Sequence, residues 1–139
     1  MIELGEEVVE RVASAIDSGN VLTAAYVDEA GKPRIAFYGS THVCGTDQLA
    51  LWVRNPDSTL LKTLAERPHM AFIYGDVSNR IYYTFEGRGR ASATDRERVY
   101  EGIHPVERKY DPDKNGVAVV VDLDRFTSLG VAGKVVQER

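Results

Sequence analysis

The chain has 139 residues, of which 43% are hydrophobic and 27% are charged, the composition of an ordinary globular protein. Its formal net charge of -4 argues against a general nucleic-acid binder, and no apolar run approaches the ~20 residues that a membrane-spanning helix needs. The N-terminus lacks the basic start and apolar block of a signal peptide, and Cys44, the one cysteine, permits neither an intrachain disulfide nor a cysteine metal cluster. We therefore expect a single cytoplasmic domain over residues 1–139, with no membrane or nucleic-acid partner.

The N-terminal segment is predicted to form a helix that ends before the first strand. Apolar residues from Val8 to Ile16 recur at helical spacing, opposite a row of charged residues, which predicts a helix over residues 4–17. The sequence Asp-Ser-Gly-Asn at residues 17–20 is a strong helix stop. The apolar stripe of such a helix needs a partner surface, so the helix is expected to pack against the rest of the fold.

Strand patterns dominate the remainder of the chain. They cover residues 21–27, 34–43, 49–54, 70–74, 81–91 and 117–129. Alternation is clearest from Ile81 to Ala91, where Gly87 and Gly89 indicate a sharp bend or a close backbone approach, as at the corner of a barrel. The tail beyond Gly130 is short and is expected to be mobile unless a partner holds it.

Helical patterns interrupt these strands. The sequence Pro-Asp-Ser at residues 56–58 offers an N-cap for a short helix, which Arg-Pro at residues 67–68 closes. Residues 94–102 have helical spacing, and one further helical turn is expected around Glu107. Six strands joined mainly as hairpins are accommodated most economically as one antiparallel barrel with peripheral helices, because closure removes exposed sheet edges.

Three segments carry a likeness to a known family. They are VLTAAYVDEAGKPRIAFYGS, LALWVRNPDSTLLKTLAERPHMAFIY and YYTFEGRGRAS. Their order and spacing resemble the pyridoxamine 5'-phosphate oxidase-like FMN-binding split-barrel family over about residues 8–129. The resemblance implies a mainly β fold with peripheral helices, built as a six-stranded antiparallel split β-barrel. It also implies an oxidoreductase that binds FMN at the subunit interface of a homodimer and acts on a small molecule.

The resemblance further implies where the cofactor is held: along the second strand, at the third strand and the start of the following helix, and by a residue from the partner subunit. The positions that match are Ala36, Phe37, Tyr38, Ser40, Trp52, Val53, Arg54, Ser58, Thr59, Lys62 and, from the partner, Tyr82.

The phosphate end of this site also has a physical basis in the residues themselves. A helix that starts near Ser58 presents unpaired N–H groups and the positive end of its dipole to an anion. Arg54 can add a bidentate contact, and Lys62 lies four residues after Ser58, on the same helical face. The competing interpretation is that Ser58 only caps the helix, while Arg54 and Lys62 are solvated.

The identity of the cofactor is left open between FMN, a deazaflavin coenzyme, a haem and an empty cleft, because Thr59, Leu60 and Ala36 stand where the family commonly has basic residues. A haem would need an axial ligand, for which His42 or His104 are the candidates. The histidines are too dispersed to indicate a metal site, and no nucleophile is paired with a base, so catalytic residues are not assigned and the cofactor would supply the chemistry. A non-enzymatic flavin carrier or redox sensor is the alternative function.

The expectation of a homodimer has a physical motive as well. A barrel of about six strands in so short a chain encloses no room for a flavin ring, so the ligand must lie on an outer face. Such a face becomes a pocket only when another subunit covers it.

Overall fold

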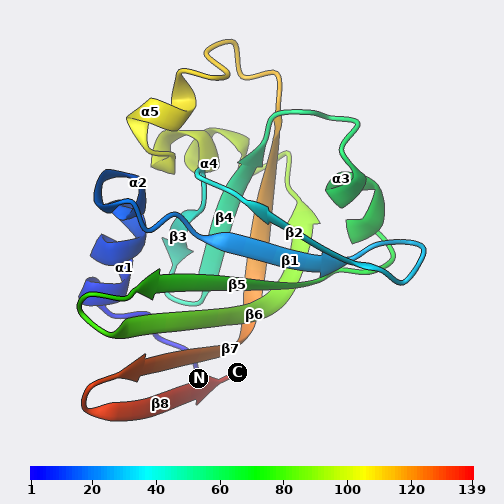
Figure 1. Ribbon diagram of the computed structural model, residues 1–139. Helices are drawn as coiled ribbons and strands as arrows, with labels where there is room; N and C mark the ends of the chain where they lie inside the picture. Colours follow the sequence, from blue (N-terminus) through cyan, green and yellow to red (C-terminus); the bar gives the residue numbers. More distant parts are fainter.

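The computed structural model describes all residues from Met1 to Arg139, and its centre is one strongly bent, eight-stranded antiparallel sheet (Figure 1). Along this sheet the strands follow the order β2-β1-β5-β6-β7-β4-β3, and β8 pairs with β7. The strands are β1 Thr23–Val27, β2 Pro33–Phe37, β3 His42–Gly45, β4 Gln48–Val53, β5 His69–Asp76, β6 Ile81–Ala91, β7 Val117–Gly130 and β8 Gly133–Glu138. The ends of the path, β2 and β3, are not hydrogen-bonded to each other, so the barrel remains split.

Five short helices surround the sheet. They are α1 Glu6–Ala13, α2 Ala15–Ser18, α3 Thr59–Leu64, α4 Arg96–Gly102 and α5 Pro105–Arg108. Figure 1 shows α4 and α5 beside the upper ends of β3 and β4, and α3 on the other side of those strands. None of the helices combines the length and the apolar character that a membrane span requires.

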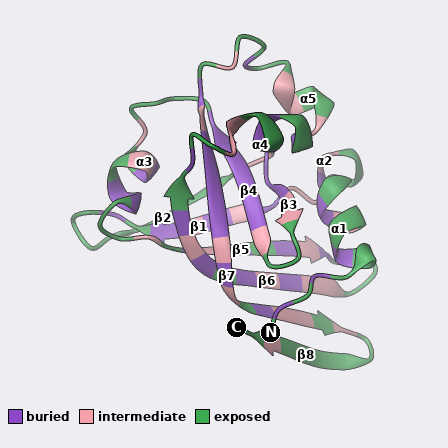
Figure 2. Cartoon of the chain, turned by 180° about the vertical axis from the view of Figure 1, so that it is seen from behind, coloured by how far each residue is buried: buried purple, intermediate pink, exposed green.

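Two hydrophobic clusters hold the sheet together. The larger contains 22 buried residues and fills the barrel, with Phe72, Phe85 and Val121 among its least exposed members. The smaller contains seven residues around Trp52 and Tyr100, where α4 covers the outer side of β4 and β7. Because β4 and the first part of β7 are covered on both faces, they are almost continuously apolar instead of alternating (Figure 2).

The predicted bend in the long strand lies at Gly87. The register of β6 against β7 shifts between Glu86 and Gly87, which is a β-bulge. A side chain at Gly87 would collide with the carbonyl oxygen of Asp122, so this close backbone approach requires glycine. The glycine prediction is confirmed here as a kink in the barrel wall.

The predicted fold class is confirmed, but the number of strands is eight and not six. The expected strand over residues 34–43 is divided into β2 and β3 by a turn in which Thr41 N donates to Tyr38 O (3.1 Å). The tail expected to be mobile forms β8, which is paired along its length with β7 from Gly130 to Arg125. β8 is exposed on both faces, so its sequence lacks the alternation of apolar and polar residues that signals a half-buried strand.

The predicted N-terminal helix is also divided. Ser14 has φ -98° and ψ 10°, and its hydroxyl donates to the carbonyl oxygen of Glu10 (2.8 Å), so α1 ends there and α2 begins at Ala15. The α2 helix ends at Gly19 in the left-handed conformation (φ 78°), at the predicted stop. The later helices lie where the sequence predicted them, including the single turn α5 around Glu107.

Candidate functional site

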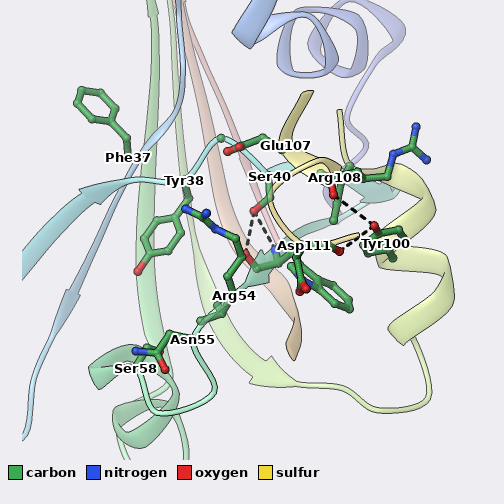
Figure 3. Close-up of a pocket in the computed structure, with 14 residues that line it drawn as sticks. Phe37, Tyr38, Ser40, Arg54, Asn55, Ser58, Tyr100, Glu107, Arg108 and Asp111 are labelled. Carbon is green, nitrogen blue, oxygen red and sulfur yellow. Dashed lines mark hydrogen bonds between the residues drawn. The ribbon is translucent and has the colours of Figure 1, made fainter. Parts of the chain in front are cut away.

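A cavity of about 500 Å³ lies where β2 and β4 end and where the chain approaches α3 and α5 (Figure 3). This volume is within the range of roughly 300–1,000 Å³ that small-molecule and cofactor sites occupy. Seven of the eleven positions that the resemblance implied line this cavity: Phe37, Tyr38, Ser40, Trp52, Val53, Arg54 and Ser58. Gly39 and Asn55 also line it, and the rest of the wall comes from residues 100–111, far along the chain.

At the cavity, the side chain of Ser40 makes the hydrogen bonds to β4 that a neighbouring strand would otherwise make. Continuing the β3–β4 register would place Ser40 opposite Trp52, but β3 begins only at His42. The Ser40 hydroxyl takes over that pairing, because it donates to Trp52 O (3.1 Å) and accepts from Trp52 N (2.9 Å). The Ser40 side chain is buried and engaged in both directions, so it positions β4 and is not free to bind a ligand.

Asp111 is a buried carboxylate that ties the α4–α5 segment, residues 96–111, to β4. Its Oδ2 accepts from Trp52 Nε1 (2.7 Å) and from Gly116 N (2.8 Å), and its Oδ1 accepts from Asn115 N (2.9 Å). Burial alone would raise the pKa of this carboxyl, but the three hydrogen bonds and the nearby Arg96 guanidinium outweigh burial and lower the pKa below its ordinary value. Asp111 is therefore a charged anchor of the cavity wall.

Trp52 is enclosed by this anchor and by its neighbours. Its ring meets the Tyr100 ring nearly edge-on, with 5.1 Å between centroids, and the Arg96 guanidinium lies 5.3 Å from the indole. The Tyr100 hydroxyl donates to the carbonyl oxygen of Asp111 (2.9 Å). Gly116 leaves room for the indole, since a side chain there would collide with Trp52 Nε1. The indole is thus a fixed part of the wall.

At the opposite end of the cavity, Asn55 and Ser58 lie together at the start of α3, and the Arg54 side chain extends from the end of β4 toward Tyr38 (Figure 3). The Ser58 hydroxyl accepts from Leu61 N (3.3 Å) as the N-cap of α3, which leaves its own O–H free to donate. The Asn55 side-chain oxygen accepts from Asp57 N (3.0 Å), which leaves its NH₂ group free. The Arg54 guanidinium rests over the Tyr110 ring (5.1 Å) and has no carboxylate partner. This end of the cavity has the donor set that suits an anion.

Four predicted positions lie outside the cavity. Thr59 and Lys62 are exposed on α3, because this helix turns Leu60, Thr63 and Leu64 into the barrel. Lys62 therefore does not contribute to the donor set at Ser58, contrary to the expectation from helical spacing. Asn55, which the sequence analysis did not select, lines that end of the cavity instead.

The other two positions are on strands. Ala36 alternates with Phe37 along β2 and is exposed on the opposite side of that strand. Tyr82 lies on β6, opposite Gly75, away from the cavity. It shares the outer face of the sheet with Phe37 and Ile73, so its predicted contribution from a partner subunit stays a prediction.

None of the three histidines lines the cavity. His42 is buried against Gly102, and its Nδ1 bonds to Ser40 O (2.8 Å); burial lowers the pKa of its ring. His104 uses both ring nitrogens, one toward Asp17 (3.0 Å) and one toward Val106 N (3.1 Å), as the cap of α5. Neither candidate for a haem axial ligand therefore faces this site.

Tyr38 brings a phenol to the cavity wall. The side chain is half-buried, and burial raises the pKa of the phenol, so Tyr38 is neutral at physiological pH. A neutral phenol both donates and accepts hydrogen bonds, and its ring supplies a flat apolar surface.

Comparison with known proteins places this geometry in a structural class. No protein-family model and no curated protein matches the sequence. Among solved structures, HupZ of Group A Streptococcus superposes with a TM-score of 0.71 at 12% identity, over 95% of this chain and 98% of that one. A Clostridium acetobutylicum protein related to general stress protein 26, of the pyridoxinephosphate oxidase family, gives a TM-score of 0.68 at 11% identity, over 97% and 96%. The chain has the pyridoxamine 5'-phosphate oxidase-like split-barrel fold.

The same split barrel occurs within longer chains. A heme binding protein from Mycobacterium smegmatis gives a TM-score of 0.68 at 18% identity, and the match covers 97% of this chain but only 59% of that protein. At these identities the likeness establishes the split-barrel fold alone. What such a barrel binds therefore has to be argued from the cavity itself.

Part of the cavity wall comes from the α4–α5 segment, none of whose residues was among the predicted site residues. Tyr100, Ile103, Glu107, Arg108 and Asp111 all line the cavity. One signal was present in the sequence: a strand tryptophan in a continuous apolar run is expected to be buried, and its indole N–H then needs an acceptor.

Proposed function

We propose that this split barrel binds FMN and acts as a flavin-dependent oxidoreductase on a small molecule. The observation that carries the proposal is the cavity, which joins aromatic walls to an anion-suited end where Arg54 has no carboxylate partner. FMN combines a flat apolar ring with a phosphate, and these two halves match the two ends of the cavity. When bound, the flavin supplies the transfer of a hydride or of electrons.

Each end of the cavity has an assigned task in this proposal. Arg54, Asn55 and the Ser58 hydroxyl hold the phosphate through charge-assisted and neutral hydrogen bonds. Phe37 and Tyr38 lie along the ring, and the Tyr38 phenol can hydrogen-bond to it. Asp111 holds the Trp52 wall of the cavity in place through its hydrogen bond to the indole.

We further propose that the working unit is a homodimer that forms through the outer face of the sheet. Four large apolar side chains are exposed there: Phe37 (75%), Ile35 (74%), Ile73 (52%) and Val27 (46%). The registers of β1 with β2 and β5 place Phe37 and Ile73 in one row across the sheet. An apolar face of this kind beside an open cavity favours cover by a second subunit, which would close the site.

The test compares two basic residues in ligand titrations. Arg54→Ala should weaken the binding of FMN by about 10- to 100-fold, because it removes a charge-assisted contact worth roughly 1.5–3 kcal/mol, while riboflavin binding changes little. Lys62→Ala is the matched control, since Lys62 is exposed outside the cavity and should leave both affinities unchanged. Quenching of flavin fluorescence measures both ligands.

Other outcomes would redirect or reject the proposal. A purified protein that neither quenches flavin fluorescence nor takes up flavin refutes it. A Soret band after addition of haem would favour the haem alternative, and selective uptake of a deazaflavin coenzyme would favour that cofactor. The rate at which the protein oxidises reduced FMN can be compared with and without added acceptors. If no acceptor makes this rate faster than oxygen alone does, the function is that of a non-enzymatic flavin carrier or redox sensor.

A further inference from the structure

Tyr110 is an exposed aromatic residue whose ring contacts the side chain of Arg54. The guanidinium carbon of Arg54 lies over the ring, 5.1 Å from its centroid, and Tyr110 is 61% exposed. Tyr110 belongs to neither of the two buried hydrophobic clusters and stacks on no other aromatic ring. The contact with Arg54, and not a place in the core, therefore distinguishes this tyrosine.

The backbone that carries Tyr110 is fixed relative to the strand that carries Arg54. Tyr110 N donates to the carbonyl oxygen of Glu107 (3.1 Å). The next residue, Asp111, accepts from the Trp52 indole (2.7 Å), and Trp52 lies on β4, two residues before Arg54. These bonds place the ring beside the end of β4 from which the Arg54 side chain extends (Figure 3).

The Arg54 side chain has no other partner that would orient it. Its guanidinium forms no ion pair and donates no hydrogen bond within the chain. An arginine side chain that is free in solvent loses rotamer entropy when a ligand fixes it. A contact that restricts the side chain before the ligand arrives lowers this cost and so raises the affinity.

An aromatic ring is a suitable partner for an arginine that has to bind an anion. The guanidinium is planar, and a ring attracts it through its flat side, so its N–H groups remain free to donate in the plane of the group. A carboxylate would instead occupy these donors and would compete with the anion for them. The Tyr110 ring thus restricts the Arg54 side chain while its charge and its donors stay available.

We propose that Tyr110 is a positioning residue, whose ring holds the Arg54 guanidinium ready for the FMN phosphate. This inference rests on the proposed FMN site. Tyr110 itself does not line the cavity, so it acts through Arg54. The α4–α5 segment then has two tasks, because Asp111 holds the Trp52 wall and the preceding residue orients the arginine at the anion-suited end.

A graded series of substitutions at Tyr110 tests the proposal, with FMN and riboflavin as the two ligands in fluorescence-quenching titrations. Tyr110→Leu should weaken FMN binding about two- to fivefold, the strength of a cation–π contact at an exposed site, and should leave riboflavin binding unchanged. Tyr110→Phe keeps the ring and should bind FMN like the wild type. Tyr110→Trp provides a more strongly attracting ring and should bind FMN at least as tightly as the wild type. Circular dichroism should show that these variants at an exposed position remain folded.

A double-mutant cycle determines whether Tyr110 acts through Arg54. In the Arg54→Ala background, Tyr110→Leu should have no further effect on FMN binding. A loss that persists in that background, or an equal loss for riboflavin, would mean that Tyr110 contacts the ligand itself and would overturn the proposal. A Tyr110→Phe variant as weak as Tyr110→Leu would assign the effect to the phenol hydroxyl and would overturn it as well.

Failure of this inference can be told apart from failure of the proposed function. If Arg54→Ala weakens FMN binding and Tyr110→Leu does not, the FMN site stands and the role of Tyr110 is refuted. If Arg54→Ala binds FMN as tightly as the wild type, the phosphate assignment is wrong and the role of Tyr110 is refuted with it.

Discussion

Asp111 holds the α4–α5 segment to the barrel, and its replacement by alanine is the most informative single perturbation of this structure. The substitution leaves Trp52 Nε1 and Gly116 N without acceptors, and both lie at buried residues. An unsatisfied buried donor costs about 1–3 kcal/mol, so two donors cost about 2–6 kcal/mol. The substitution also removes the desolvation penalty of the buried carboxylate, which offsets part of this loss of stability. We expect Asp111→Ala to lower the free energy of unfolding by about 2–4 kcal/mol.

Asp111→Asn is the matched control for this perturbation. The amide oxygen can still accept from Trp52 and Gly116, while the amide NH₂ group faces Asn115 N, which belongs to an exposed residue. The loss should therefore be closer to about 1 kcal/mol. Urea unfolding followed by far-ultraviolet circular dichroism is the suitable assay, because Trp52 fluorescence reports on the altered contact itself.

The pH dependence gives an independent check of the charge. The pKa of the Asp111 carboxyl is lower in the folded protein than its ordinary value of 3.8, so its stabilisation is fully present above about pH 4 and is lost as the pH falls through the folded pKa. The stability difference between the wild type and Asp111→Asn should shrink over that window. If Asp111→Ala unfolds within about 0.5 kcal/mol of the wild type, the carboxylate does not anchor the segment and the reasoning fails.

The remaining predictions concern packing, protonation and assembly. Burial lowers the pKa of His42, so its contribution to the free energy of unfolding is fully present above about pH 6.5 and is lost as the pH falls below that value. In urea unfolding, the free energy of unfolding of His42→Asn should therefore depend less on pH between about pH 5 and 7 than that of the wild type. Gly102→Ala forces a methyl group against the buried imidazole and should cost about 1–3 kcal/mol in the same assay. Gly39→Ala meets only the mobile end of a glutamate side chain and should cost less than about 0.5 kcal/mol. Phe37→Asp should halve the molar mass of the protein in solution, measured by light scattering. Val131→Asp, at a similarly exposed turn position, should leave that mass unchanged. Equal masses for the two variants would contradict the outer-face dimer.

The barrel could be predicted from the sequence because its signals are local. Alternation from Ile81 to Ala91 defines β6 to the residue, and the glycine at the bulge marks where the wall turns. The stop at Gly19 and the cap at Ser58 are equally local. β8 could not be predicted in the same way, because its only strand partner is the last part of β7, which extends past the end of β4.

The candidate site was predictable only where neighbours in sequence are also neighbours in space. Arg54 and Ser58 reach the same cavity because the strand end, the turn and the helix start follow one another directly. Helical spacing alone also placed Lys62 beside Ser58, but spacing does not specify which side of a six-residue helix faces the cavity. The packing of Leu60 and Leu64 into the barrel decides that, and it turns Lys62 to solvent.

The far wall of the cavity depends on a contact across 59 positions of sequence, between the Trp52 indole and the Asp111 carboxylate. No local pattern contains such a contact, but the requirement for it does follow from the sequence. An indole in a continuous apolar strand is buried, and a buried N–H must find an acceptor. The acceptor has to be polar in a segment that can cover the strand, and Asp111 follows the predicted turn around Glu107. Hydrogen-bond satisfaction of one buried tryptophan thus points to the segment that completes the site, where periodicity and helical spacing do not.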